Sequence, residues 1–149
     1  MPVRGAAETI DLLIKSMASK DYESANALFA PDVVVVEPDS VPFYSGTHRG
    51  WEAVQRDLFG PMLTNYDLTV NPGTKAHDAG DVVVGTLDLT VTSRATGASV
   101  RTNVVEIYTV VDGLIRHIDV YYKDPVLMAR AFPEGLPTSD AHTTTQSVG

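Results

Sequence analysis

The chain of 149 residues is 44% hydrophobic and 20% charged, which is typical of a single soluble globular domain. Its formal net charge of -8, without any cluster of lysine or arginine, argues against a nucleic-acid partner and against binding to an anionic membrane. Because the chain has no cysteine, it has no disulfide, thiol nucleophile or thiolate metal site. No apolar run approaches a membrane span and the start lacks the apolar stretch of a signal peptide, so we expect a cytoplasmic protein.

The first half of the sequence is dominated by helix signals. Four apolar residues share one helical face and predict an amphipathic helix over residues 6–19: Ile10, Leu13, Ile14 and Met17. Asp21 is a suitable cap for a second short helix over residues 22–29, which Pro31 ends. A third helix is expected over residues 51–62, with a kink or an end at Gly60-Pro61.

The remaining segments have strand patterns. The apolar run 33–37 predicts a strand that ends at Glu37-Pro38, and a loop over residues 39–46 follows it. Asp112-Gly113 is a strong signal for a tight hairpin. Further strands are expected over residues 67–70, 81–93, 99–111 and 114–123. A short helix after Pro125 completes a single domain over residues 1–132, and the tail 133–149, rich in Thr and Ser, is expected to be disordered.

Three helices followed by long antiparallel strands indicate an α+β fold. We expect a strongly curved antiparallel sheet whose concave face is crossed by the N-terminal helices. Such an arrangement leaves a cone-shaped pocket between sheet and helices, and the mouths of such pockets bind small ligands.

Glu106 interrupts an apolar strand face. Side chains alternate along a strand, so Val104, Glu106 and Tyr108 point to the same side. Burial among apolar groups would raise the pKa of this carboxyl group and leave it a proton donor near neutral pH. Such a group is either paired structurally, for example with Arg101 or Arg116, or functional.

Two long segments resemble a known family. The runs KDYESANALFAPDVVVVEPDSVPFYSGTHRGWEAV and VVEIYTVVDGLIRHIDVYYKDP are similar to the SnoaL-like and ketosteroid-isomerase-like members of the nuclear transport factor 2 superfamily. The resemblance covers residues 6–130 and implies the cystatin-like cone fold. It is less specific for the reaction, because this cone serves isomerases, cyclases, epoxide hydrolases, dehydratases and non-enzymatic binders.

The resemblance to ketosteroid isomerase implies roles for two acids. Glu37 stands where that family has its proton-shuttling base, and Glu106 stands where it keeps a protonated aspartate that stabilises the developing oxyanion. The family's oxyanion tyrosine on the first helix is replaced by Leu13. Three tyrosines are candidates to supply the missing hydroxyl: Tyr22, Tyr44 and Tyr108. Eight residues are expected to line the cone and contact the substrate: Trp51, Phe59, Met62, Val104, Tyr108, Ile118, Val120 and Tyr122.

Two further aspartates are weaker catalytic candidates. His117 and Asp119 resemble the His-x-Asp of SnoaL-like cyclases, but Asp119 comes one residue early, so without a bulge both side chains face away from the pocket. Asp88 resembles the catalytic aspartate of limonene-epoxide-hydrolase-like members, although Thr86 stands where that family has an arginine. The four histidines show no metal-binding spacing, so we expect no metal and no cofactor.

Three functions remain open at this point. The leading hypothesis is a cofactor-free isomerase or polyketide cyclase, in which Glu37 removes a proton next to a carbonyl of an apolar cyclic substrate and Glu106 stabilises the enolate. The second is epoxide hydrolysis or epoxide-opening cyclisation through Glu37, Asp88 or Asp119. The third is a non-catalytic ligand-binding module, which the loss of the helix tyrosine favours. The resemblance also implies a homodimer.

Overall fold

Residues 2–39 and 44–135 are described by the computed structural model, which confirms an α+β fold. The helices are α1 (Ala6–Ala18), α2 (Tyr22–Asn26), α3 (Trp51–Val54), α4 (Gly60–Asn65) and α5 (Pro125–Ala131). The strands are β1 (Phe29–Glu37), β2 (Gly46–Arg49), β3 (Tyr66–Val70), β4 (Lys75–Asp78), β5 (Val83–Ser93), β6 (Ser99–Val111) and β7 (Leu114–Tyr122).

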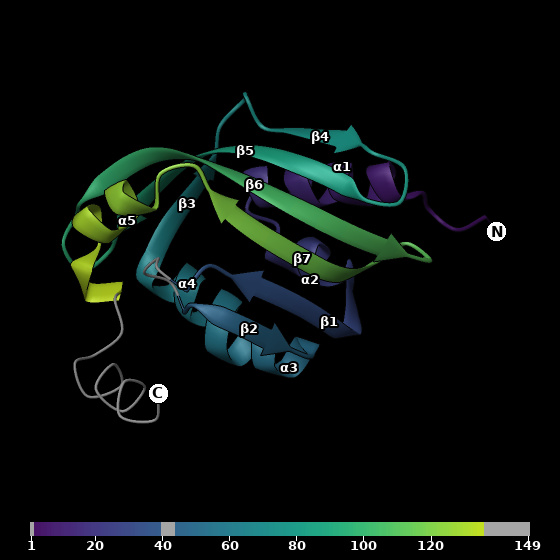
Figure 1. Cartoon of the computed structure of the whole chain (residues 1–149), viewed down its shortest axis with the longest axis horizontal. Coiled ribbons are helices and arrows are strands. Elements are labelled where there is room, and N and C mark those ends of the chain that lie inside the picture. The colour runs from purple at the N-terminus through teal and green to yellow at the C-terminus, as the bar shows by residue number, and fades with distance from the viewer. Residues whose placement is uncertain (1, 40–43, 136–149) are drawn as a thin grey trace.

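The strands of the described chain form one curved sheet in the order β2-β1-β7-β6-β5-β3, with β4 paired to β5 at the same edge (Figure 1). All neighbours are antiparallel except β1 and β7, which run parallel, so the sheet is mixed rather than purely antiparallel as expected. Parallel strands need a long crossover, and here the chain from β2 to β6 supplies it. Helix α1 lies behind β5 and β6 in the view of Figure 1.

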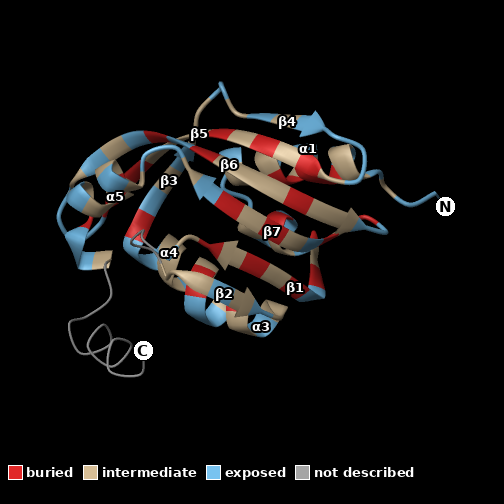
Figure 2. Ribbon diagram, in the orientation of Figure 1, coloured by how far each residue is buried: buried red, intermediate tan, exposed pale blue. Residues whose placement is uncertain are grey.

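The long central strands agree with the sequence patterns. Strand β6 has the bounds expected from the sequence, and the hairpin to β7 is confirmed by positive φ angles of 52° at Asp112 and 75° at Gly113. Buried and less buried residues alternate along these strands (Figure 2). The alternation gives the sheet one face that lines the core and one that is more polar.

The third predicted helix is continuous but changes its winding. A π-helical turn, Gln55–Phe59, joins α3 to α4, and Pro61 lies in the first turn of α4. Proline lacks an N–H and its ring crowds the preceding turn, which explains the wider winding before it. A Cβ on Gly60 would lie only 2.5 Å from the carbonyl oxygen of Gln55, so glycine is needed there. The helical segment therefore changes its winding at this point but does not end.

Three details differ from the sequence expectations. Helix α2 ends at Asn26, and β1 already begins at Phe29 and passes through Pro31. Pro31 is accommodated because the pairing of β1 with β7 is irregular between Phe29 and Val34, so its missing N–H removes no ladder hydrogen bond. The short strands β2 and β4 were not expected, since their sequences GTHR and KAHD carry no apolar alternation.

The ends of the chain are only partly described. Pro133–Gly135 form a short 3-10 helix, and the expected disordered tail otherwise lies outside the described residues. Within the described ranges, every helix is too short or too polar to span a membrane.

Candidate active site

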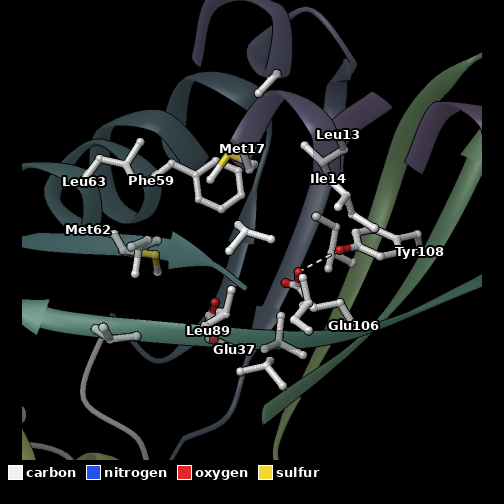
Figure 3. A pocket seen from close by; sticks show the side chains of 18 of the residues that line it. Leu13, Ile14, Met17, Glu37, Phe59, Met62, Leu63, Leu89, Glu106 and Tyr108 are labelled. Atoms are coloured by element: carbon white, nitrogen blue, oxygen red, sulfur yellow. Dashed lines mark hydrogen bonds between the residues drawn. The ribbon is translucent and has the colours of Figure 1, made fainter. Parts of the chain in front are cut away.

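The concave face of the sheet and the helices α1, α2 and α4 enclose a cavity of about 140 Å³ (Figure 3). Helix α1 contributes Leu13, Ile14 and Met17, which are three of the four residues of the apolar face predicted from the sequence. Of the residues expected to contact substrate, these line the cavity: Phe59, Met62, Val104, Tyr108, Ile118, Val120 and Tyr122.

Trp51 is the exception among the expected lining residues. Its ring stacks on Phe29 with 4.8 Å between ring centroids and meets the edge of Phe59 at 6.2 Å. Phe29 and Phe59 line the cavity and Trp51 does not, so Trp51 packs behind these two rings and supports the wall.

The two predicted acids, Glu37 and Glu106, both line this apolar cavity (Figure 3). Glu37 is the last residue of β1, and Glu106 lies in the middle of β6. Strand β7 runs between them, with Val120 opposite Glu106 and Asp119 opposite Val36. The two acids therefore flank Val120 on strands two apart, which places their backbones about 10 Å from each other and lets their side chains converge over a small residue.

Glu106 is held by a neighbour on its own strand face. The hydroxyl of Tyr108 donates a hydrogen bond of 2.7 Å to Glu106 Oε1. Tyr108 is only 1% exposed, and Glu106 is half-buried and lines the cavity. Burial raises the pKa of Glu106, while the Tyr108 hydrogen bond opposes that rise. Burial and the same contact raise the pKa of Tyr108 well above its usual value, so its hydroxyl stays a donor.

Gly85 makes room for that tyrosine. It lies opposite Glu106 on β5, and a Cβ there would come within 2.8 Å of the Tyr108 ring. Glycine in a strand interior often marks a close approach of this kind. The sequence shows this glycine inside the strand pattern VVVGTLDL. Without the register of β5 against β6, however, it does not show which side chain lies over the glycine.

Glu37 is buried without a partner. Its side chain is 5% exposed, and Oε2 has no hydrogen-bond partner among the described residues. Burial, and then the nearby charge of Glu106, raise the pKa of Glu37 to about 8. Glu37 is thus protonated at neutral pH, whereas an ordinary glutamate is ionised.

The two acids are unequal in how well each tolerates a charge. Tyr108 donates to Glu106, which stabilises its ionised form, while no group among the described residues donates to Oε2 of Glu37. At neutral pH the charge of the pair is therefore better placed on Glu106, with the proton on Glu37. This is the reverse of the roles implied by the ketosteroid isomerase resemblance, in which Glu106 is the neutral partner.

The candidate hydroxyl groups have different positions. Tyr108 and Tyr22 line the cavity, whereas the hydroxyl of Tyr44 accepts a 2.9 Å hydrogen bond from Asn65 outside the cavity lining. Tyr122 also lines the cavity, and burial followed by the charges of Glu37 and Glu106 raises its pKa well above the usual value. Tyr122 is therefore a second neutral hydroxyl near the pair of acids.

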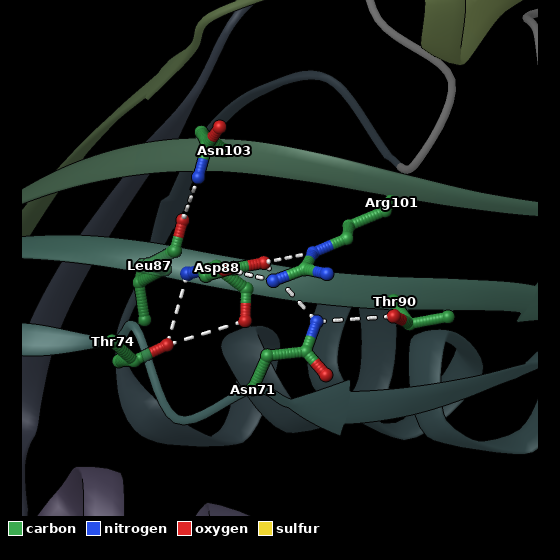
Figure 4. A network of polar contacts seen from close by, with 7 residues as sticks. All are labelled: Asn71, Thr74, Leu87, Asp88, Thr90, Arg101 and Asn103. Carbon is green, nitrogen blue, oxygen red and sulfur yellow. Dashed lines mark hydrogen bonds and ion pairs between the residues drawn. The ribbon is translucent and has the colours of Figure 1, made fainter.

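Asp88 does not enter the cavity, which corrects the catalytic role considered for it. It alternates with the lining residues Leu87 and Leu89 and so lies on the opposite face of β5. There it accepts hydrogen bonds from both Nε and Nη2 of Arg101, at 2.9 and 2.7 Å, and from Asn71 at 3.1 Å (Figure 4). These contacts lower its pKa to about 2. The structure therefore does not fit an epoxide-hydrolase mechanism that uses Asp88 as a catalytic residue in the pocket.

Asp119 is also outside the cavity lining, which corrects the catalytic role considered for it. Ile118, Val120 and Tyr122 line the cavity, as strand alternation predicted, and Asp119 instead accepts a 2.7 Å hydrogen bond from Tyr121. The irregular pairing between Thr109 and Val110 lies nearer the hairpin and does not turn Asp119 inward.

The arginines that were potential partners of Glu106 are engaged elsewhere. Arg101 pairs with Asp88, and Arg116 pairs with Asp32 at 3.2 Å. No group of three or more His, Asp or Glu side chains within the described ranges is arranged to hold a metal ion. The acidic pair thus has Tyr108 as its one hydrogen-bond donor among the described side chains.

Comparisons with known proteins agree with this fold. The family model for the SnoaL-like domain matches residues 10–118. A crystal structure of an NTF2-like protein from Burkholderia thailandensis is 27% identical, with a TM-score of 0.75 over 87% of this chain and 98% of that chain. A Mesorhizobium loti protein provisionally named a SnoaL-like polyketide cyclase is 24% identical, with a TM-score of 0.63 over 80% of this chain and 100% of that chain.

TerC, co-crystallised with polyporic acid, shares the fold at 21% identity, with a TM-score of 0.71 over 85% of this chain and 96% of that chain. No match is found among curated proteins. The SnoaL-like model covers well over half of the sequence, and the chain therefore belongs to the SnoaL-like family of the nuclear transport factor 2-like superfamily.

Proposed function

We propose that this protein is a cofactor-independent enzyme that transfers protons on a neutral, apolar cyclic ketone, as an isomerase or a polyketide-cyclase-like enzyme does. The observation that carries this proposal is the pair Glu37 and Glu106 in one apolar cavity, with Glu37 Oε2 buried and unpaired. Buried acids with raised pKa values are suited to proton transfer near neutral pH. The name of the Mesorhizobium loti relative of the same fold, a SnoaL-like polyketide cyclase, supports this reaction class.

The proposed reaction uses the unequal charges of the pair. Ionised Glu106 removes a proton from the carbon next to the substrate carbonyl, and the C–H electrons form the enolate. Protonated Glu37 donates a hydrogen bond to the enolate oxygen, and Tyr122 is close enough to both acids to assist. Glu106 then returns the proton to a different carbon, which moves the double bond, or the enolate carbon attacks a second carbonyl, which closes a ring and leaves an alkoxide that takes the proton from Glu106.

The cavity supports a small and neutral substrate. A water molecule needs about 10–15 Å³ of cavity, so the space of about 140 Å³ accepts on the order of ten non-hydrogen atoms, or a molecule of one or two rings. The described lining contains no Lys, Arg or His to neutralise an anion. A charged carboxylate or phosphate would therefore be repelled by Glu106 and poorly solvated.

Hydrogen–deuterium exchange of 2-tetralone tests this function, since this two-ring ketone has an acidic CH₂ next to its carbonyl. The wild-type protein in deuterated buffer at pH 7 should accelerate exchange measured by NMR, and the double variant Glu37→Gln/Glu106→Gln should not. Both substitutions preserve shape and remove both titrating groups. Exchange at the rate of buffer alone, or equal exchange by the double variant, would refute the proposal and favour a non-catalytic binder.

A further inference from the structure

Thr102 lies in the same cavity, away from the two acids. Thr102, Val104 and Glu106 share the cavity face of β6, and the four-residue separation of Thr102 and Glu106 corresponds to about 13 Å along the strand. Thr102 is 4% exposed, and its hydroxyl oxygen has no hydrogen-bond partner among the described residues. A buried hydroxyl of this kind is uncommon in a folded protein.

The surroundings of Thr102 do not explain a hydroxyl there. Leu89 lies opposite Thr102 on β5, and Val91 and Met128, which belong to one apolar cluster with Leu89, also line the cavity. These side chains offer neither a good donor nor a good acceptor. Valine has nearly the same shape as threonine and would pack here without the cost of burying an unpaired hydroxyl. A threonine at this position is therefore consistent with a hydrogen bond between its hydroxyl and a bound ligand.

We propose that Thr102 is a specificity-determining residue that hydrogen-bonds a second oxygen of the substrate, at the end remote from the reacting carbonyl. This inference rests on the proposed function, because the acids fix the end at which the carbonyl reacts. It narrows the substrate class to a neutral, elongated ketone of about two rings with an oxygen substituent at each end. The cavity size and the separation of Thr102 from Glu106 are both consistent with that length.

Two naphthalene probes isolate this contact. The compound 2-naphthol carries one oxygen and resembles the enol of 2-tetralone, while naphthalene-2,6-diol adds a second oxygen at the far end. In fluorescence titrations, the wild-type protein should bind the diol about 3- to 10-fold more tightly than 2-naphthol, the range expected for one neutral hydrogen bond. Thr102→Val should abolish this preference without changing the affinity for 2-naphthol, and Thr102→Ser should retain it.

Stability measurements separate a ligand-binding role from a structural one. Since the Thr102 hydroxyl has no hydrogen-bond partner in the part of the chain that the structure describes, Thr102→Val should melt at the same temperature as wild type or higher. A lower melting temperature, equal binding of the two probes by wild type, or a preference that survives in Thr102→Val would each overturn the inference. Loss of 2-tetralone exchange with the diol preference intact would instead refute the proposed reaction and leave Thr102 as part of a binding site.

Discussion

Glu106 and Asp88 are carboxylates on neighbouring strands of one sheet, and they face opposite sides of it. Asp88 accepts several hydrogen bonds from Arg101 and Asn71 on the outer face, and its pKa falls to about 2 (Figure 4). Glu106 has one donor, Tyr108, inside an apolar cavity, and its pKa rises. Side chains alternate between the two faces of a strand, so the two carboxyl groups meet different surroundings. The pKa of the group on the outer face is lowered and it stays ionised near neutral pH, whereas the pKa of the group in the cavity is raised towards neutral pH.

The difference also separates a structural role from a chemical one. The polar groups of Asp88 are satisfied by its neighbours. In the loop before β4, the Thr74 hydroxyl donates a hydrogen bond to the Asp88 carbonyl oxygen and accepts one from the Asp88 N–H. Glu37 and Glu106 keep unused capacity that points into a ligand-sized space. Unsatisfied groups on the cavity face, rather than acidity as such, mark the candidate site.

The largest expected effect is the loss of proton transfer in Glu106→Gln. Removing a positioned base costs about 10²- to 10⁴-fold in rate, whereas Asp88→Asn, its matched control on the outer face, should leave the rate unchanged. The measurement is 2-tetralone exchange by each variant. If both variants lose activity equally, the two faces do not differ in function and the comparison fails.

Next in size is the effect at Glu37, which tests the assignment of the two acids. Glu37→Leu removes the donor to the enolate and should lower the exchange rate about 10²- to 10³-fold. Glu37→Gln keeps an N–H donor and should lower it much less. If Glu37→Gln is instead the more damaging change and Glu106→Gln the milder one, Glu37 is the base, as the resemblance to ketosteroid isomerase implied.

The free energy of unfolding should depend on pH because Glu37 is buried on the cavity face. The pKa of Glu37 is raised from 4.5 to about 8 in the folded protein, so folding favours its protonated form. That contribution is fully present below pH 4.5 and is lost as the pH rises through 8. The free energy of unfolding should fall across this range by an amount on the order of 5 kcal/mol, from about 1.36 kcal/mol per pKa unit.

Urea denaturation at several pH values between 4 and 9 measures this slope. Glu37→Gln cannot titrate and should lose most of the decrease, while Glu106→Gln should also flatten the slope because the burial of Glu106 raises its pKa in the same direction. An unchanged slope in Glu37→Gln would mean that Glu37 is ionised and solvated in the folded protein.

Sequence patterns predicted the backbone of the site better than its chemistry. Alternation and the Asp112-Gly113 hairpin placed β6 and β7, and with them the cavity positions of Val104, Glu106 and Tyr108. These features depend on local spacing. Gly85 and Thr102 were missed because their meaning depends on the pairing of β5 with β6, which brings Gly85 under the Tyr108 ring.

The roles of the acids needed the same long-range information. Nothing in the local sequence around Glu37 shows that its Oε2 has no donor among the described residues. The donor to Glu106 is the local exception, because Tyr108 lies two positions further along the same strand, on the face predicted from the sequence. For Asp88, the sequence offers Arg101 without the register that joins them across β5 and β6. Charge distribution in this fold is a property of the assembled sheet.

The smallest expected effect concerns the outer face and completes the comparison. Arg101 is 69% exposed on its side chain, so water screens its pairing with Asp88, and Asp88→Asn should lower the melting temperature only slightly at pH 7. Because the pKa of Asp88 is lowered to about 2, its stabilising contribution is present above its ordinary value of 3.8 and is lost as the pH falls towards 2. Thermal melts between pH 2 and 9 should therefore show Asp88→Asn differing from wild type by a small, pH-independent amount above pH 3.8 and converging with it as the pH falls towards 2, whereas Glu37→Gln should change the slope of the profile between pH 4.5 and 8. If Asp88→Asn also changed the slope between pH 4.5 and 8, the outer network would be coupled to the cavity acids through β5, and the two faces would not act independently.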